Sequence, residues 1–403
     1  AGTLTGASDL ELATGAMPFL FKADFGTPAN ANQIVIDIVK RTATELGLNR
    51  SQTSAYDAIF AALGNDEDIE QVFLGISDGD VFRSTVSRML PDHAGGTFEG
   101  VSLGSRTFAR QVADPPSPVY SIGGIDVIVS SALWSSDKDA GETAAYDLGG
   151  FGFSAAGEVD TKVGAFGLSA SWMWNEYDQL GGDQSANSDT YELGAYWRGH
   201  WGGFTAFGRG SIGKVDADGW RLFRYTLDEK EVERQVKGEW GGTLMTASAG
   251  MAYEFGGEGA FFARPSVSAD YVSLDEDGYT ETGGDEALDL TVEDRKSDEF
   301  AVNGGLTLGI NFTGNGRRDE NWFRTEVEGG WREVVGGELG STTASFEDGT
   351  PFTLTPEERS NGWFARLRAL GGSDMFEMSG EVGAEDRNDK TALTLRGSLR
   401  LAF

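Results

Sequence analysis

Cysteine is absent from the 403-residue chain, and histidine occurs only twice, as His93 and His200. The absence of cysteine excludes disulfides, thiolate metal sites and a cysteine nucleophile. Two histidines leave little scope for zinc sites or for histidine-based catalysis. We therefore expect no catalytic residues, no metal site and no cofactor, and the expected function is not enzymatic.

Long hydrophobic runs are also missing. No stretch of about 18 apolar residues occurs, so the sequence predicts no transmembrane helix. A transmembrane β-barrel needs no such run, because every second residue of its strands can be polar. Prolines are few, 9 in all, whereas the 58 glycines follow no collagen-like repeat. This balance suits many tight turns and closely neighbouring strands.

Basic residues are half as common as acidic ones, 32 against 64, which gives a net charge of −32. Phosphate binding requires clustered lysine and arginine, so nucleic acid is not an expected partner. The acidic residues gather in segments such as 275–277 and 285–299. Such segments are typical of solvated loops. A layer of bound cations is the alternative, although no calcium-loop spacing occurs.

The first residues, Ala1 to Thr3, have neither the basic start nor the apolar core of a signal peptide. We therefore expect the chain to be a mature form or part of a longer protein. All ten tryptophans lie at or after Trp134. This distribution predicts different environments before and after about residue 133.

Residues 1–50 contain short apolar pieces separated by glycine and asparagine, at Leu10–Leu12, Phe19–Phe21 and Ile34–Val39. These pieces predict brief strands. They would form either the last coils of a β-solenoid or a poorly ordered cap.

From Ser51, a plausible N-cap, the apolar residues follow a helical period. Two more helices are expected to begin at Asp66 or Asp68 and at Asp78 or Asp80, and Pro91 ends the last one. The sequence therefore predicts a small packed helical subdomain over 51–92.

Residues 94–111 are small, polar and punctuated by glycine, which makes a poor free helix in water. Such a segment suits a narrow, hydrated, enclosing space, and it suits a plain linker equally well. The run Pro115–Pro118 then breaks the chain.

Alternating apolar and polar residues dominate the remainder, and a period of two is that of a β-strand. Twelve such segments occur, at 125–134, 144–156, 163–177, 188–200, 203–226, 231–255, 260–282, 286–312, 320–335, 343–370, 374–387 and 390–403. Short glycine-rich connections, as at Gly202–Gly203, alternate with longer acidic ones, as at 135–143, 180–187 and 337–356. Sorting loops in this way is typical of outer-membrane barrels.

The two faces of these segments differ in chemistry. The apolar face carries aromatics near its ends, such as Trp172 and Trp363, which predicts two interfacial belts. A large aromatic soluble core is the alternative. The other face carries both positive and negative side chains, and burying so many charges in the core of a closed sandwich would be strongly unfavourable. In a barrel it would line a hydrated lumen wide enough for one helix. The candidate pore-lining residues are Glu192, Arg209, Arg264, Asp270, Glu299, Arg324, Glu326, Glu328, Arg366, Arg368, Glu381, Arg396 and Arg400.

These features together resemble the C-terminal translocator domain of a type Va autotransporter over roughly residues 30–403. The resemblance is carried by the helical run 49–63, the segment 94–111, the twelve strands and the stretch 265–284. The aromatic Phe403 is similar to the family's assembly signal. The candidate signal residues are Leu395, Leu399, Leu401 and Phe403.

The resemblance implies an all-β fold. It would be a 12-stranded antiparallel transmembrane β-barrel over 119–403, with an α-helical segment over 93–118 threading the pore. Residues 1–50 would be a small extracellular passenger remnant, and 51–92 its helical junction. The candidate pore-helix residues are Phe98, Val101, Leu103, Ser105, Arg106, Phe108 and Arg110.

The implied function is that of an autotransporter translocator in the bacterial outer membrane, which anchors its own passenger and mediates its secretion to the cell surface. Implied partners are outer-membrane lipid and lipopolysaccharide, the barrel-assembly machinery, periplasmic chaperones and the passenger, around a monomeric barrel. Some relatives cut themselves at an asparagine pair on the pore helix. Residues 94–111 contain no asparagine, so we expect no such cleavage.

Two other functions compete. The first is an outer-membrane diffusion channel plugged by its N-terminal segment. The second is a barrel protease or lipase, for which neither histidine has a recognisable partner. The Gly100–Gly104 stretch matches a Gly-X-Ser-X-Gly nucleophile elbow, but it lacks the strand before and the helix after that the elbow requires, so a chance match is expected.

Overall fold

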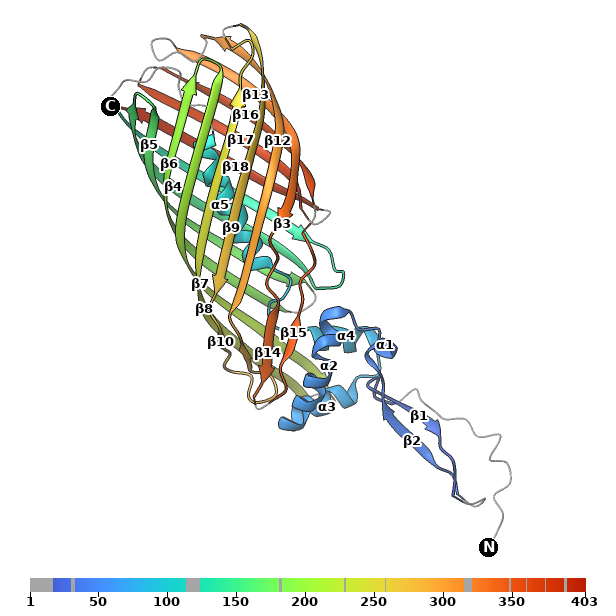
Figure 1. Cartoon of the computed structure of the whole chain (residues 1–403). Helices are drawn as coiled ribbons and strands as arrows, with labels where there is room; N and C mark the ends of the chain where they lie inside the picture. Colours follow the sequence, from blue (N-terminus) through green and yellow to red (C-terminus); the bar gives the residue numbers. More distant parts are fainter. Residues whose placement is uncertain are drawn as a thin grey trace.

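The computed structural model of the chain describes residues 17–29, 33–113, 124–180, 183–227, 230–257, 259–314, 321–347, 349–359, 361–373, 375–387 and 390–403. Figure 1 shows a two-stranded hairpin, a group of short helices, and a long barrel with one helix inside it. The hairpin and the short helices lie at one end of the barrel, and the C-terminal residue lies at the other. We call these the outer end and the inner end.

The barrel is a closed sheet of twelve strands whose neighbours are all antiparallel. The strands are β3 (Ile125–Lys138), β4 (Ala145–Thr161), β5 (Gly164–Leu180), β6 (Gln184–Trp201), β7 (Phe204–Leu227), β8 (Lys230–Tyr253), β9 (Phe261–Glu276), β12 (Arg295–Thr313), β13 (Trp322–Gly336), β16 (Gly362–Gly372), β17 (Phe376–Arg387) and β18 (Lys390–Ala402). Pairing of β18 with β3 closes the sheet. The predicted 12-stranded antiparallel barrel is confirmed.

Two of the turns at the inner end are very short. The strands β6 and β7 are joined through Gly202 and Gly203 alone. Gly202 has a φ of 62°, in the left-handed region that a side chain disfavours, so the turn requires glycine there. The same short type of turn joins β4 to β5, with Thr161 paired to Gly164.

At the outer end the strands themselves are long. Each of β7 and β8 has 24 residues, paired as far as Leu227 with Lys230. The expectation of a loop over 180–187 is wrong, because β5 and β6 stay paired up to Gln179 and Gln184. This part of the wall has polar residues on both faces. The apolar–polar alternation is therefore missing over 180–187 because both faces of the wall are polar there, and not because the segment is a loop.

A second, four-stranded sheet stands on the outer rim. It consists of β10 (Tyr279–Thr280), β11 (Leu290–Val292), β14 (Thr342–Phe346) and β15 (Phe352–Leu354), in that order. The expected strands 286–312 and 343–370 each merge a rim strand with a barrel strand, and this is wrong: the barrel strands begin at Arg295 and Gly362. Rim strands also bury one face, so they show the same alternation.

The short helices are α1 (Ala43–Leu46), α2 (Arg50–Ala62), the 3₁₀ helix η3 (Leu63–Asn65), α3 (Glu67–Gly75) and α4 (Gly79–Ser87). The expected N-cap Ser51 is wrong, since Asn49 caps α2 and exchanges hydrogen bonds with Gln52 in a capping box. Asp66 caps α3 and Asp78 caps α4. None of the helices in the described ranges has the length and hydropathy of a membrane-crossing helix.

One hydrophobic core joins the short helices to the outer end of the barrel. Ile69, Val72 and Phe73 of α3 are fully buried in it, together with Leu290 of β11 and Leu354 of β15. Polar contacts surround this core. Arg50, for example, donates hydrogen bonds to the carbonyls of Thr355 and Pro356 at 2.9 Å. The helices therefore form a cap that is packed onto the rim.

The N-terminal hairpin pairs β1 (Phe21–Phe25) with β2 (Ile36–Lys40). It covers part of the region where the sequence predicts brief strands. The expected strand at Leu10–Leu12 and the break at Pro115–Pro118 lie outside the described residues.

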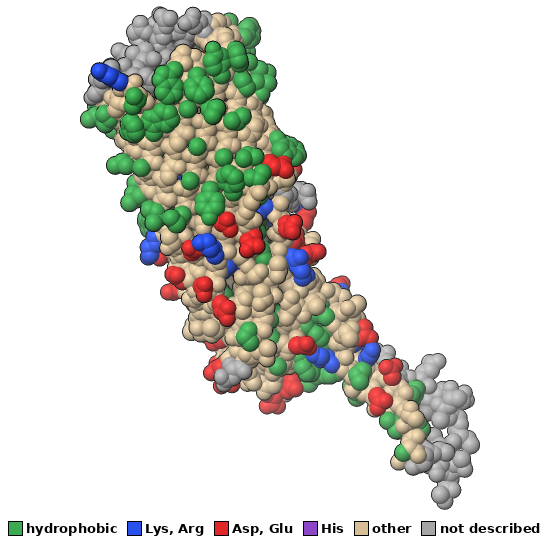
Figure 2. Space-filling model, in the orientation of Figure 1, with side chains coloured by type: hydrophobic (Ala, Val, Ile, Leu, Met, Phe, Trp, Pro, Cys, Tyr) green, Lys and Arg blue, Asp and Glu red, His purple; other side chains and the backbone are tan. Residues whose placement is uncertain are grey.

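Exposed apolar residues occur on every strand of the barrel and form an apolar belt. On the face that Figure 2 shows, the belt covers the half of the barrel nearer the inner end. On β7 the outward residues are apolar or glycine up to Ile212, and Lys214 and Asp216 follow on the same face. About ten residues per strand is the length that a tilted strand needs to cross a bilayer. Exposed aromatics such as Trp201, Phe312 and Trp331 lie within this belt.

Candidate functional site

The lumen of the barrel is occupied by one helix, α5 (Gly96–Ala113). Its 18 residues span about 27 Å at 1.5 Å per residue. It begins near the outer end, where Gly96 lies against Tyr177, and it contacts β3 to β8 along its length. Of the two interpretations of residues 94–111, the structure shows the enclosed helix. A segment with three glycines in its first nine residues is helical here because the barrel surrounds it.

Glycines on one face of α5 let the helix approach the wall closely. Gly96, Gly100 and Gly104 follow each other at intervals of four and therefore share a face. A Cβ atom at Gly104 would lie 2.7 Å from the Trp134 ring, and one at Gly96 would lie 1.9 Å from the Tyr177 ring. Larger side chains on this face would displace the helix from the wall toward the centre of the lumen.

Apolar residues of α5 pack on the same side of the barrel. Phe108 meets Trp134 edge to face, with 6.4 Å between ring centroids. Phe98, Val101 and Leu103 are buried in the same cluster. Four of the seven candidate pore-helix residues therefore form its apolar contact with the wall.

Near the outer end a buried carboxylate fixes the helix to the wall. Glu99 has no exposed surface and accepts hydrogen bonds from Arg387 of β17 at 3.0 and 2.8 Å. It also accepts one from Arg359. Glu299 of β12 pairs with both of these arginines, at 3.4 and 3.6 Å. We call these four residues the Glu99 cluster.

The other charged and polar candidates of α5 are paired farther along the helix. Arg106 donates to Glu385 at 2.7 Å, and Arg110 donates to Glu381 at 2.9 Å. Ser105 donates to Glu192 at 3.0 Å. Hydrogen bonds to charged groups are the stronger kind. They join α5 to β6 and β17, on opposite sides of the lumen.

All thirteen candidate pore-lining residues lie on the inner face of the barrel and are buried or nearly so. The structure brings most of them together as ion pairs. The pairs and groups are Glu192 with Arg209, Glu326 with Arg264, Arg324 and Arg368, Asp270 with Arg332, Glu299 with Arg332, Glu328 with Arg366, and Glu381 with Arg396. Arg400 pairs instead with Asp126 and Glu158.

Sequence reasoning named neither Glu99 nor its partners Arg359 and Arg387 among the candidates. A signal for Glu99 was present, because Glu99, Arg106 and Arg110 are spaced by seven and four residues and so share a helical face. Arg359 lies in a segment that the sequence assigns to a strand, so no sequence pattern indicated that it pairs with Glu99 near the outer end of the lumen.

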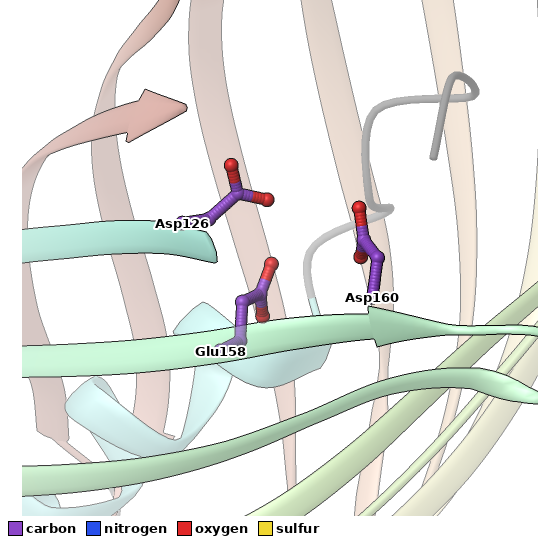
Figure 3. A group of neighbouring side chains, drawn as sticks. All are labelled: Asp126, Glu158 and Asp160. Atoms are coloured by element: carbon purple, nitrogen blue, oxygen red, sulfur yellow. The ribbon is translucent and has the colours of Figure 1, made fainter. Parts of the chain in front are cut away.

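One group of acidic side chains has the spacing of a possible metal site. Carboxylate oxygens of Asp126, Glu158 and Asp160 lie within 4.8 Å of one another at the inner end of β3 and β4. Figure 3 shows the three side chains beside one another. Arg198 donates to Glu158 at 2.5 Å, and Arg400 donates to Asp126. Two of the three carboxylates therefore already have guanidinium partners, and we assign no metal to the group.

The candidate assembly-signal residues lie on the outer face of β18. Leu395, Leu401 and Phe403 are exposed, and Leu399 is half-buried. Main-chain hydrogen bonds of 2.9 and 3.3 Å join Phe403 to Ile125 at the start of β3. These residues are therefore part of the seam that closes the barrel.

The residues considered for an enzyme are not brought together. His93 is buried before α5, where its Nδ1 lies 2.8 Å from the carbonyl of Pro91, and burial lowers its pKa. His200 lies beside the inner-end turn at Gly202. Ser102 is inside α5 and donates to the carbonyl of Glu99. The Gly100–Gly104 stretch is thus part of a helix and not a strand-to-helix elbow.

Comparisons with known proteins agree with this geometry. The family model described as "Autotransporter beta-domain" matches residues 131–371, more than half of the chain. Comparison with curated protein sequences gives no match. The chain is similar to the translocator domain of autotransporter NalP from Neisseria meningitidis. The TM-score is 0.61 at 15% identity, over 77% of this chain and 99% of that one.

A second similar structure is the transport unit of the autotransporter AIDA-I from Escherichia coli. Its TM-score is 0.49 at 13% identity, over 78% of this chain and 100% of that one.

Proposed function

The chain belongs to the autotransporter family, as a β-domain that forms an outer-membrane translocator, and from this premise we propose that α5 is the segment left in the pore once the passenger has passed through it. The expected location in the outer membrane, with the N-terminal part outside the cell, agrees with the family. An autotransporter barrel secretes its own passenger. The proposal concerns how this barrel holds and closes the path afterwards.

The direction of the chain through the lumen carries the proposal. The cap lies at the outer end, α5 descends inside the closed barrel, and β3 begins at the inner end, where Asp126 pairs with Ala402 of the last strand. A closed barrel has no lateral opening for a folded cap to pass. Residues before α5 must therefore have crossed through the lumen, or the barrel must have closed around them.

The alternative of a plugged diffusion channel has less support. In a diffusion channel the lumen-filling segment need not be tied to an external domain. Here α5 is held by the Glu99 cluster, by Arg106 and Arg110, and by a close glycine face. These contacts support a helix that stays in place after secretion.

Conductance in planar bilayers tests whether α5 closes the pore. We expect the full chain to conduct little and a variant lacking 94–111 to show large, steady openings. A matched control replaces that segment with a flexible glycine-serine linker of equal length, which should also conduct. If both variants conduct no more than the full chain, α5 does not close the pore.

We propose further that β18 is the strand read by the barrel-assembly machinery, after delivery by periplasmic chaperones. Leu395, Leu399, Leu401 and Phe403 lie on its outer face, where a partner could contact them before closure. Replacing Leu399 and Leu401 with Asp should abolish the heat-modifiable barrel in the outer membrane while synthesis continues. Leu367→Asp on β16 combined with Val382→Asp on β17 is the control, since it places the same two negative charges on the lipid-facing side of other strands. Equal loss in both would indicate a general cost of charge in lipid.

We propose that the barrel has no enzymatic activity of its own, including self-cleavage within α5. The segment 94–111 has no asparagine, and the described histidines lie at opposite ends of the barrel. Mass spectrometry of the purified chain should find no new N-terminus between His93 and Val112. A cleaved product there would contradict the proposal.

A further inference from the structure

A cavity remains inside the barrel beside α5. Its volume is about 160 Å³, and it lies between the C-terminal half of α5 and the wall from β7 to β18. Arg106 and Arg110 line it from the helix, and Arg264, Arg332, Arg366 and Arg368 line it from the wall. The glycine face of α5 lies on the other side of the helix, so the helix leaves this space open.

Positive charge exceeds negative charge around the cavity. Among the described residues that line it, six arginines face three carboxylates, those of Asp270, Glu328 and Glu385. Including the ion-paired neighbours outside the Glu99 cluster gives eight arginines against six carboxylates, since Arg324 and Arg396 join one side and Glu254, Glu326 and Glu381 join the other. The Glu99 cluster, nearer the outer end, has two arginines and two glutamates, so its charges are balanced. This excess occurs in a chain whose net charge is −32.

The arginines also retain unused hydrogen-bonding capacity. Arg366 reaches Glu328 at 3.3 Å, and Glu328 is shared with Arg110 at 3.4 Å. The Nε atoms of Arg106 and Arg332 are buried without a hydrogen-bond partner in the described part of the chain. A buried donor without an acceptor is unfavourable, and like charges repel strongly where water is scarce. An anion that accepts hydrogen bonds would satisfy the unpaired donors and would also reduce the repulsion between the arginines.

We propose that a small inorganic anion, with chloride as the simplest case, binds in this cavity between Arg366 and the α5 residue Arg106. The acidic group of Asp126, Glu158 and Asp160 is not part of the cavity lining and does not compete. The anion makes contact with both the helix and the wall, so it also helps to hold α5 in place. The site does not depend on secretion, and binding can be measured on the purified barrel.

The stability of the barrel should respond to chloride at constant ionic strength. Replacing gluconate, a bulky and weakly binding anion, with chloride should raise the midpoint of heat-induced loss of the compact barrel by about 2 °C or more near saturation. Arg366→Gln should lose this response, and Arg366→Lys should retain part of it. Arg224→Gln removes an exposed arginine near the outer end and should respond as the wild type does. An equal chloride response in Arg366→Gln would overturn the proposal.

Crystals of the full chain grown in sodium bromide provide a direct test that needs no variant. Anomalous scattering should place bromide in the cavity within ion-pair distance of Arg366. Anomalous peaks confined to the protein surface, with an unoccupied cavity, would overturn the proposal whatever the variants do.

Discussion

Glu99→Gln is the substitution that tests most directly how α5 is held. Glutamine has nearly the same shape as glutamate, so packing is kept and only the charge is removed. Arg387 then loses the carboxylate that accepts its two bonds at 3.0 and 2.8 Å, and Arg359 loses its partner as well. Both guanidinium groups stay buried with Glu299 as the remaining carboxylate of the cluster.

The magnitude follows from the burial of the cluster. Hydrogen bonds to charged groups are worth about 1.5–3 kcal/mol each, and removing one partner of a buried ion pair costs about 3–5 kcal/mol. Glu299 offsets part of this loss, so we expect about 3 kcal/mol. A change of this size makes the displaced state of α5 more than 100-fold more populated. The other contacts of the helix still favour its docked position.

Two assays measure this effect on the same preparation. Urea unfolding in lipid vesicles should show the loss of stability, and bilayer recordings should show brief openings that the wild type lacks. The double variant Glu99→Leu with Arg387→Met removes the pair together and should recover much of the stability, since paired apolar replacements are often neutral. If Glu99→Gln loses less than about 0.5 kcal/mol and its conductance is unchanged, the Glu99 cluster does not hold the helix.

Three further outcomes follow from the structure. Gly104→Val should push α5 away from Trp134, lower stability by about 1–3 kcal/mol and raise conductance, as measured in the same two assays. Asn49→Ala should remove the cap of α2, destabilise that helix by about 1 kcal/mol in hydrogen exchange and leave conductance unchanged. Burial would raise the pKa of Glu357, but the Thr143 amide and the Lys138 ammonium lower it below its usual value. The difference in thermal midpoint between Glu357→Gln and the wild type should therefore be present at pH 7 and vanish as the pH falls well below about 4; a constant difference would contradict this assignment.

The barrel itself could be predicted because its rule is local. Alternation along segments such as Phe300–Phe312 reports which side faces lipid, and the lipid-facing side is apolar on every strand. Inward charges such as Arg264 and Glu326 followed from the same alternation. Their partners could not be predicted, because pairing between nearby strands of the wall depends on strand order and register.

The outer part of the molecule could not be predicted in this way. Between the belt and the outer end, both faces of a strand meet polar surroundings. Gln184 and its neighbours therefore show no apolar–polar alternation, and the sequence predicted a loop there. Rim strands such as Leu290–Val292 alternate because they cover helices, and the sequence does not say what covers a face. Glu99 was missed for a related reason, since its three arginine and carboxylate neighbours come from distant segments.

The 24-residue strands have a consequence for where the cap stands. On β7 the belt ends near Ile212, and the strand continues for 15 more residues to Leu227. At about 3.3 Å per residue and a tilt of roughly 40°, this continuation rises on the order of 35 Å beyond the lipid. The barrel is thus also a pedestal. It would hold the cap well away from the membrane surface.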